Sequence, residues 1–236
     1  MKNYVVINGR SSKELIGLAI NELPPISKPS LRTRVETIDG RDGDIITELG
    51  YSAYDKSFTI GLFGNGYDIN DVISFFNAEG TISFSNEEDK YYRFKMVNQI
   101  DFEQLLKFRT ATVTVHVQPF KYSTVEFNKS YPITNSTCKV TNLGNYKSKP
   151  KFTITGSGTI NLSLNGSQVM VINLGETSST IIIDTEKMEA YNTSGVLKNR
   201  DVTGSYNNLA LNPGVNTLAW TGTITQIKIE RASRWL

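Results

Sequence analysis

The stretch FRTATVTVHVQP, residues 108–119, decides the fold class of this chain. Apolar and polar residues alternate through it, and the apolar positions are Ala111, Val113, Val115 and Val117. A period of two residues is typical of a β-strand that buries one face and exposes the other. The sequence therefore predicts a long strand over 108–118 that ends at Pro119.

The same alternation recurs on the N-terminal side of this strand. It predicts further strands around residues 58–62, 82–84 and 92–96. The polar run SNEEDK (85–90) separates the last two and is typical of a hairpin loop. The first half of the chain is therefore expected to be mainly β.

One helix is predicted, in YDINDVISFFNAEG (67–80). Its apolar residues Ile69, Val72, Ile73 and Phe76 are spaced i, i+3, i+4 and i+7, which is the period of an amphipathic helix. Asp68 or Asn70 can cap its start and Gly80 suits its end, which gives roughly three turns.

The composition changes near residue 129, where YPITNSTCKVTNLGNYKSKP (131–150) is rich in Asn, Ser, Thr and Lys. Short apolar segments then alternate with turn signals about every ten residues, among them KFTIT (151–155), TINLSL (159–164), NTLAWTG (216–222) and TQIKIE (225–230). This spacing favours a β-sandwich. LNGS (164–167) is the clearest hairpin turn. We therefore predict two domains, 1–128 and 129–236.

The charge and cysteine content exclude several classes of protein. The 236 residues carry a formal charge of only +2, which does not indicate a nucleic-acid-binding polyelectrolyte. The first 128 residues hold 14 basic and 17 acidic side chains, and the remainder hold 11 and 6. Cys138 is the only cysteine, so no internal disulfide forms. No run approaches the ~20 apolar residues of a membrane span, and we expect an intracellular product without membrane insertion.

No catalytic constellation is found in the sequence. His116 is the single histidine, so a zinc site of ordinary composition has too few ligands. The nucleophile-elbow, phosphate-loop and dinucleotide-binding motifs are missing, and GNG (64–66) and GSG (156–158) are interpreted as turns. We expect neither an enzyme nor a cofactor.

The run DGRDGD, residues 39–44, raises the question of a metal site. Asp39, Asp42 and Asp44 offer oxygen ligands, but the spacing does not fit a calcium loop, whose alternate positions are acidic or amide residues. The third position from Asp39 is Arg41, and the fifth from Asp42 is Ile46. RVETI and DIIT flank the run, so we predict a hairpin with a glycine-rich charged tip and no ion.

Aromatic residues of the second half raise the alternative of a carbohydrate-binding module that recognises host cell-wall glycan. Sugars stack on exposed rings, and Tyr191, Tyr206 and Trp220 lie in or near predicted loops and strand ends. The competing interpretation is structural, because a tryptophan in NTLAWTG is often a sandwich core residue.

The order of these features resembles the distal tail protein (Dit) family of long non-contractile-tailed bacteriophages. The first half is similar in YVVINGRSS (4–12), VETIDGRDGDI (35–45), DKSFTIGLFG (55–64), the helix near residue 70 and GTISFSN…YYRFKMV (80–97). The second half is similar in GSGTINLSLNG (156–166), TIIIDTEKMEAY (180–191) and LNPGVNTLAWTGTITQIKIERASRW (211–235). The resemblance implies an N-terminal tail-tube-like β-sandwich or barrel with one α-helix and a C-terminal galectin-like β-sandwich.

The resemblance also implies a role. Six copies would form a ring, singly or as two stacked rings, that joins the tail tube to a tail-associated lysin or baseplate hub protein, with receptor-binding proteins as further partners. Genome DNA would pass through the lumen without specific binding. Because acidic side chains outnumber basic ones in the first 128 residues, we expect the lumen to be acidic. The protein would be assembled in the host cytoplasm and reside in the virion. In such a ring the tip Asp39, Gly40, Arg41, Asp42, Gly43 and Asp44 would contact the adjacent subunit or ring.

Overall fold

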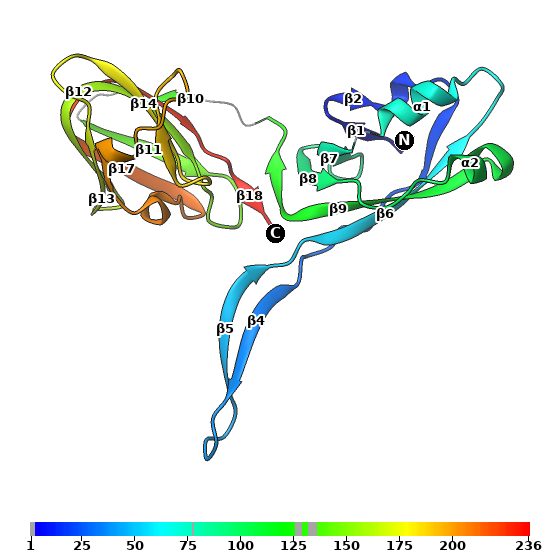
Figure 1. Cartoon of the computed structure of the whole chain (residues 1–236), viewed down its shortest axis with the longest axis horizontal. Coiled ribbons are helices and arrows are strands. Elements are labelled where there is room, and N and C mark those ends of the chain that lie inside the picture. The colour runs from blue at the N-terminus through cyan, green and yellow to red at the C-terminus, as the bar shows by residue number, and fades with distance from the viewer. Residues whose placement is uncertain (1–2, 77, 126–128, 132–135) are drawn as a thin grey trace. The chain divides into compact units, whose positions relative to one another are not determined.

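The structure is a computed structural model that describes residues 3–76, 78–125, 129–131 and 136–236 (Figure 1). It consists mainly of β-strands, which confirms the predicted fold class. The chain divides into two compact units, Met1–Thr124 with Leu236 and Val125–Trp235, called unit 1 and unit 2 below. The expected boundary between 128 and 129 adjoins residues outside the described ranges. The tail-tube-like and galectin-like identities of the two domains stay predictions.

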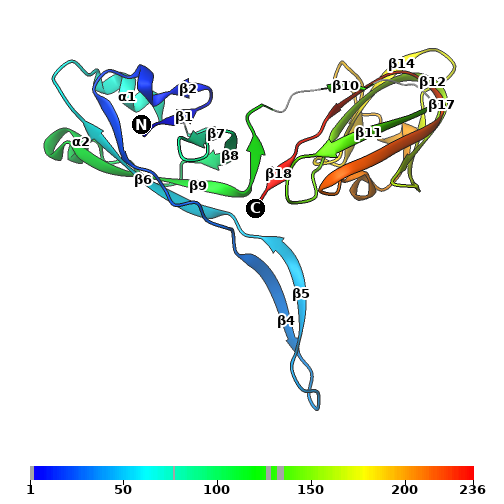
Figure 2. The ribbon, with the colours of Figure 1, turned by 180° about the vertical axis from the view of Figure 1, so that it is seen from behind.

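Unit 1 is built on one antiparallel sheet with the strand order β2-β1-β7-β8-β9-β6-β3 (Figure 2). A separate two-stranded sheet, β4-β5, is inserted between β3 and β6. The elements are β1 (Val5–Ile7), β2 (Arg10–Ser11), the 3-10 helix η1 (Ser12–Glu14), β3 (Leu18–Glu22), β4 (Leu31–Thr37), β5 (Asp44–Tyr51), β6 (Tyr54–Leu62), α1 (Ile69–Phe75), β7 (Glu79–Phe84), β8 (Lys90–Lys95), α2 (Phe102–Phe108) and β9 (Thr110–Ser123).

Strand β9 confirms the alternation predicted for residues 108–118, because Ala111, Val113, Val115 and Val117 are all buried. The strand does not end at Pro119, however, and continues to Ser123. Its pairing with β8 shifts register there: Val117 pairs with Phe94, whereas Lys121 pairs with Tyr92. A proline at such an irregularity removes no ladder hydrogen bond, so the strand passes through it.

Helix α1 begins where predicted, because the Asp68 side chain accepts a 2.9 Å hydrogen bond from the Asn70 amide. It is shorter than expected and ends at Phe75, while Gly80 lies in β7. Val72 and Phe75 are its buried residues, and Phe58 of β6 packs edge-on against Phe84 of β7 at a centroid distance of 5.8 Å. The core of unit 1 lies between α1 and the sheet.

The prediction of a single helix is wrong, because α2 forms a second one. Asp101 caps it by accepting a 2.8 Å hydrogen bond from the Gln104 amide, and Leu105 is its buried residue. Seven residues with one buried position give too weak a period to be recognised in the sequence. Neither helix of the described part of the chain is long and apolar enough to cross a membrane.

Unit 2 is a β-sandwich whose two long central strands take part in both layers. β12 and β17 pair with each other. One half of β12 pairs with β14, which in turn pairs with β15, and the same end of β17 pairs with β10. The other half of β12 pairs with β13, which in turn pairs with β16, and the other end of β17 pairs with β11. The elements are β10 (Lys129–Tyr131), β11 (Thr137–Asn142), β12 (Lys151–Leu164), β13 (Ser167–Asn173), β14 (Ser179–Asp184), β15 (Glu189–Tyr191), η3 (Asn199–Asp201), β16 (Val202–Gly204), η4 (Tyr206–Leu209), β17 (Gly214–Glu230) and β18 (Arg234–Trp235).

Two segment pairs predicted as separate strands are therefore single strands. KFTIT and TINLSL both belong to β12, and NTLAWTG and TQIKIE both belong to β17. Glycines let the two strands bend where they cross between layers: a Cβ on Gly156 would lie 2.2 Å from the Thr223 carbonyl oxygen, and one on Gly222 would lie 2.3 Å from that of Thr159. GSG is thus a bend inside a strand, not a turn between strands.

The LNGS turn is confirmed. It joins β12 to β13, and Asn165 and Gly166 have φ angles of 52° and 86°. Two consecutive left-handed residues are what a two-residue hairpin loop requires, and Asn-Gly is the pair that tolerates them best.

Candidate subunit-contact site

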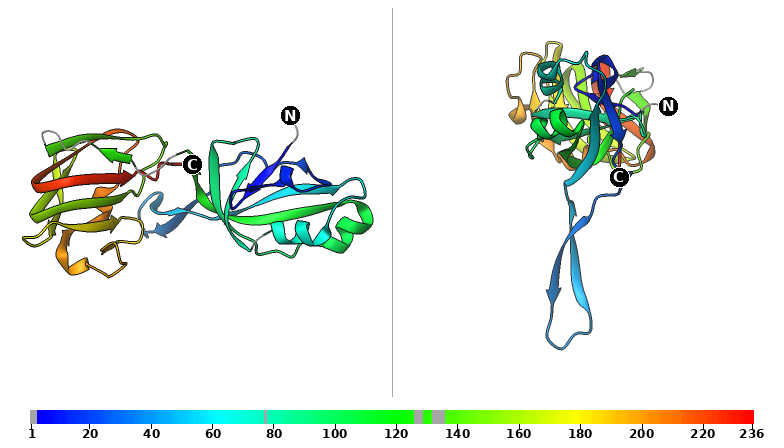
Figure 3. Two further views of the ribbon diagram at one scale, coloured as in Figure 1. Left: turned by 90° about the horizontal axis from the view of Figure 1, so that it is seen from above. Right: turned by 90° about the vertical axis from the view of Figure 1, so that its right-hand side faces the viewer.

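The run DGRDGD forms the tip of a hairpin, as predicted. Strands β4 and β5 run side by side as a two-stranded ribbon, and residues 31–51 are called the arm below (Figure 3). Val35 pairs with Ile46, and Thr37 pairs with Asp44 next to the tip. Gly40 and Gly43 both have positive φ, 80° and 76°, a conformation that a residue with a Cβ rarely adopts.

The arm exposes apolar side chains along its length. Val35 and Ile46, which face each other across the ribbon, are 54% and 63% exposed. Leu31, Ile38 and Leu49 are exposed as well. A two-stranded hairpin without a covering layer is marginally stable in water, and contiguous exposed apolar residues mark an interaction surface.

Polar contacts hold the ribbon together but leave most of the tip unpaired. Between the strands, Thr37 donates a 3.0 Å hydrogen bond to Asp44, and Arg32 Nη2 donates to the Leu49 carbonyl at 3.2 Å. Arg34 and Glu36 form a 2.8 Å ion pair within β4. In the part of the chain that the structure describes, the side chains of Asp39, Arg41 and Asp42 have no hydrogen bond or ion pair. The tip therefore carries charges that are available to a partner.

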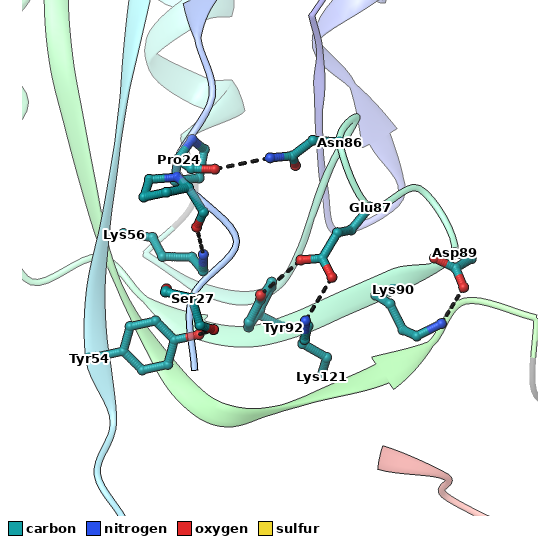
Figure 4. A network of polar contacts seen from close by, with 11 residues as sticks. Pro24, Ser27, Tyr54, Lys56, Asn86, Glu87, Asp89, Lys90, Tyr92 and Lys121 are labelled. Atoms are coloured by element: carbon teal, nitrogen blue, oxygen red, sulfur yellow. Dashed lines mark hydrogen bonds and ion pairs between the residues drawn. The ribbon is translucent and has the colours of Figure 1, made fainter. Parts of the chain in front are cut away.

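The segment between β3 and the arm, LPPISKPS (23–30), contains three prolines and thus has few amides to add to a sheet. Side chains of unit 1 hold its carbonyl oxygens instead (Figure 4). Asn86 Nδ2 donates to the Pro24 carbonyl at 3.0 Å, and Lys56 Nζ donates to that of Pro25 at 2.7 Å. Tyr54 Oη donates to the carbonyl of Ser27 at 3.4 Å. These bonds fix the root of the arm on the sheet.

Lys56 is buried at this root. Its Nζ lies 5.1 Å from the ring centroid of Tyr92 and 5.6 Å from that of Tyr54. Burial lowers the pKa of Lys56 from 10.5 to about 8, while the nearby Glu87 carboxylate opposes the shift. Glu87 itself forms a 2.7 Å ion pair with Lys121.

The hydroxyl of Tyr92 donates to the second oxygen of Glu87 at 3.2 Å. Burial raises the pKa of Tyr92, so the phenol stays protonated and remains a donor. The root of the arm is therefore a hydrogen-bonded network in which Lys56 and Lys121 both lie near the carboxylate of Glu87.

The aspartates of the tip do not gather into a metal site. Across the described residues, no group of three or more His, Cys, Asp or Glu side chains is placed to hold an ion. His116 instead lies on β9 with Nδ1 2.6 Å from Asp55 Oδ1.

The three candidate sugar-stacking residues do not form one exposed platform. Trp220 is only 5% exposed and belongs to the core of unit 2, so its ring faces are not available. Tyr206 packs against that core, and its hydroxyl donates to Asn199 at 3.2 Å. Tyr191 is half-buried at the end of β15. Sugar binding by the two tyrosines stays a prediction.

The sequence did not reveal the residues that anchor the arm. Lys56, Tyr54 and Asn86 lie 27 to 62 positions from the carbonyl groups that they bind. The one available signal is the proline content of 23–30, since a segment with few amides needs donors from elsewhere. That signal does not identify the donors.

The fold is similar to that of solved phage tail hub and baseplate chains. The chain superposes over 100% of its length on 100% of the solved chain of SPP1 Dit, with a TM-score of 0.73 and 17% sequence identity. That structure is described as a paradigm of the hub adsorption apparatus in phages that infect Gram-positive bacteria.

A chain of the phage P2 baseplate, in its activated conformation with calcium, has a TM-score of 0.50 and 11% identity over 97% of this chain and 98% of that chain. No protein-family model and no curated protein matches the sequence. At these identities the likeness is one of fold.

Proposed function

We propose that this chain is a structural hub protein of a phage tail tip. The observation that carries the proposal is the superposition with SPP1 Dit over the full length of both chains. It includes both units. The proposed role is to shape an assembly, not to catalyse a reaction.

In this proposal the chain forms a hexameric ring through unit 1. The exposed apolar arm supports assembly, because an isolated two-stranded ribbon gains stability when a neighbour covers it. Repetition of one heterologous contact closes a ring when its rotation allows closure. The ring, single or stacked in pairs, joins the tail tube to the tail-associated lysin or baseplate hub protein and to receptor-binding proteins.

Genome DNA passes through the ring without being held. The first 128 residues carry 14 basic and 17 acidic side chains, a net charge of −3. A lumen with an excess of carboxylates avoids the counterion-release affinity that a basic lining gives to DNA. A ring whose lumen is lined continuously by Lys and Arg would contradict this part of the proposal.

Electron microscopy of the purified protein tests the proposed role. We expect class averages of rings with six-fold symmetry and a central opening wide enough for duplex DNA. Particles of single-chain size at every concentration, both alone and mixed with tail-tube protein, would refute it.

A further inference from the structure

The root of the arm contains a buried amine that has no acidic partner of its own (Figure 4). Lys56 of β6 is 3% exposed, and its Nζ donates to the Pro25 carbonyl at 2.7 Å. Three aromatic rings surround Nζ: the centroids of Tyr92, Tyr54 and Phe84 lie 5.1, 5.6 and 6.0 Å away. Within the described residues, Lys56 has no ion pair. Its side chain is therefore held by one neutral carbonyl and three rings.

The charged groups nearest to Lys56 are already paired with one another. Glu87, in the turn between β7 and β8, forms a 2.7 Å ion pair with Lys121 of β9. It also accepts a 3.2 Å hydrogen bond from the hydroxyl of Tyr92 on β8. A protonated Lys56 is therefore a second ammonium group beside one carboxylate, and Lys121 repels it.

The other titratable groups near the root do not supply the missing negative charge. Asp89, in the same turn as Glu87, forms an ion pair with Lys90. Lys28 is the one titratable residue of the segment 23–30, and its side chain is exposed. Burial raises the pKa of Tyr54, whose phenol therefore stays protonated and uncharged at neutral pH.

The neutral form of Lys56 fits these surroundings better than the charged form. A neutral amine keeps an N–H for the Pro25 carbonyl and buries no charge. Burial accordingly lowers the pKa of Lys56 to about 8, although the carboxylate of Glu87 opposes the shift. Proton uptake therefore weakens the closed form of the root.

The carbonyl that Lys56 holds belongs to a segment with few other polar attachments. Among the described residues, no amide of residues 24–29 donates a hydrogen bond. Side chains hold the carbonyl groups of Pro24, Pro25 and Ser27 instead, and Lys56 holds the middle one. The other strand of the arm, β5, joins β6 through residues 52–53. Release of the segment 23–30 therefore leaves the arm fixed to unit 1 on one side only.

We propose that Lys56 is a proton-controlled latch of the arm, tight while its amine is neutral and loosened when the amine takes up a proton. In the tight form the amine binds the Pro25 carbonyl and the segment 23–30 lies on the sheet. In the released form the ammonium group reaches water, and Glu87 keeps its ion pair with Lys121. No covalent bond changes. The latch is a property of one chain and does not depend on the proposed hub role.

Thiol labelling at the root measures the latch. Pro24 is buried, so in the full-length variant Pro24→Cys the thiol reacts with iodoacetamide when the segment 23–30 leaves the sheet. The labelling rate, divided by that of the same variant unfolded in urea at the same pH, gives the opening constant. Peptide mass spectrometry separates this thiol from Cys138, which is buried in unit 2.

The sign of the pH dependence follows from the two pKa values of Lys56, about 8 in the closed form and 10.5 in the open form. Between these values the open form binds more protons, so the opening constant falls as the pH rises and levels off below about 8. We expect it to be about tenfold larger at pH 7 than at pH 9.

Two lysine variants in the Pro24→Cys background complete the test. Lys56→Met removes the titrating amine, so its opening constants at the two pH values should agree within about twofold. Lys95→Met changes an exposed lysine of the same sheet and should keep the tenfold difference. Circular dichroism checks that each variant folds, and Pro29→Cys, at another buried position of the segment, takes the place of Pro24→Cys if that variant does not fold. An opening constant independent of pH with Lys56 present, or a tenfold difference that persists in Lys56→Met, would overturn the latch.

Discussion

Lys56 provides a test of how the root of the arm is held, because its burial makes the stability of unit 1 depend on pH. The pKa of Lys56 is about 8 in the folded chain and 10.5 in the unfolded chain. Between these values the unfolded chain binds more protons, so the free energy of unfolding rises with pH in this window and is constant below it. At about 1.36 kcal/mol per pKa unit, the full difference is about 3 kcal/mol.

The measurement is urea unfolding at pH 7 and pH 10 of the unmodified chain and of Lys56→Met. Circular dichroism follows the unfolding of the chain. The Met side chain does not titrate, so the stability difference between the two proteins should change by about 2–3 kcal/mol between the two pH values, in favour of the unmodified chain at pH 10. Any difference in the strength of the bond to the Pro25 carbonyl between the two pH values is already contained in the folded-state pKa.

Lys95→Met is the matched control, because Lys95 is a largely exposed lysine of the same sheet. It should leave the pH dependence unchanged. Parallel stability curves for Lys56→Met and the unmodified chain from pH 7 to 10 would refute the argument that burial lowers the pKa of Lys56.

Three further predictions concern the arm and the core. Arg41→Ala with Asp42→Ala should weaken ring formation in sizing experiments while changing stability by only about 0.5 kcal/mol. Unchanged rings would mean that the tip is a solvated turn. A calcium-dependent melting temperature that this variant abolishes would mean that the tip binds an ion. Asn86→Ala removes the donor to the Pro24 carbonyl and should speed amide hydrogen exchange at residues 26–28 about fivefold, the equivalent of about 1 kcal/mol. Unaltered exchange would mean that this bond does not hold the root of the arm in place. Phe58→Ala should destabilise unit 1 by about 3–5 kcal/mol in urea unfolding, because the side chain is fully packed, and a loss below about 1 kcal/mol would contradict that packing.

The sequence was informative where a local pattern determines the structure. The period of two in 108–118 predicts the buried face of β9, because side chains of a strand alternate between its faces whatever lies around it. Asn165-Gly166 predicts a hairpin turn, because few other residue pairs accept two positive φ angles. Gly40 and Gly43 predict the turn at the tip of the arm in the same way, because glycine adopts the positive φ that such a turn requires.

The remainder depends on contacts that no local pattern records. The donors at the root of the arm are distant in sequence from the carbonyl groups they bind. Gly156 was interpreted as a turn, but its role is to let β12 and β17 approach closely, which only the pairing of the two strands reveals.

The mass of the purified protein in solution tests the central claim most directly. One chain has a mass of 26.3 kDa. Native mass spectrometry, with light scattering at the same concentrations, is expected to give about 158 kDa for a six-chain ring, or twice that for two stacked rings. A single species of 26.3 kDa that persists to the highest attainable concentration would contradict the assignment of this chain as a ring-forming hub.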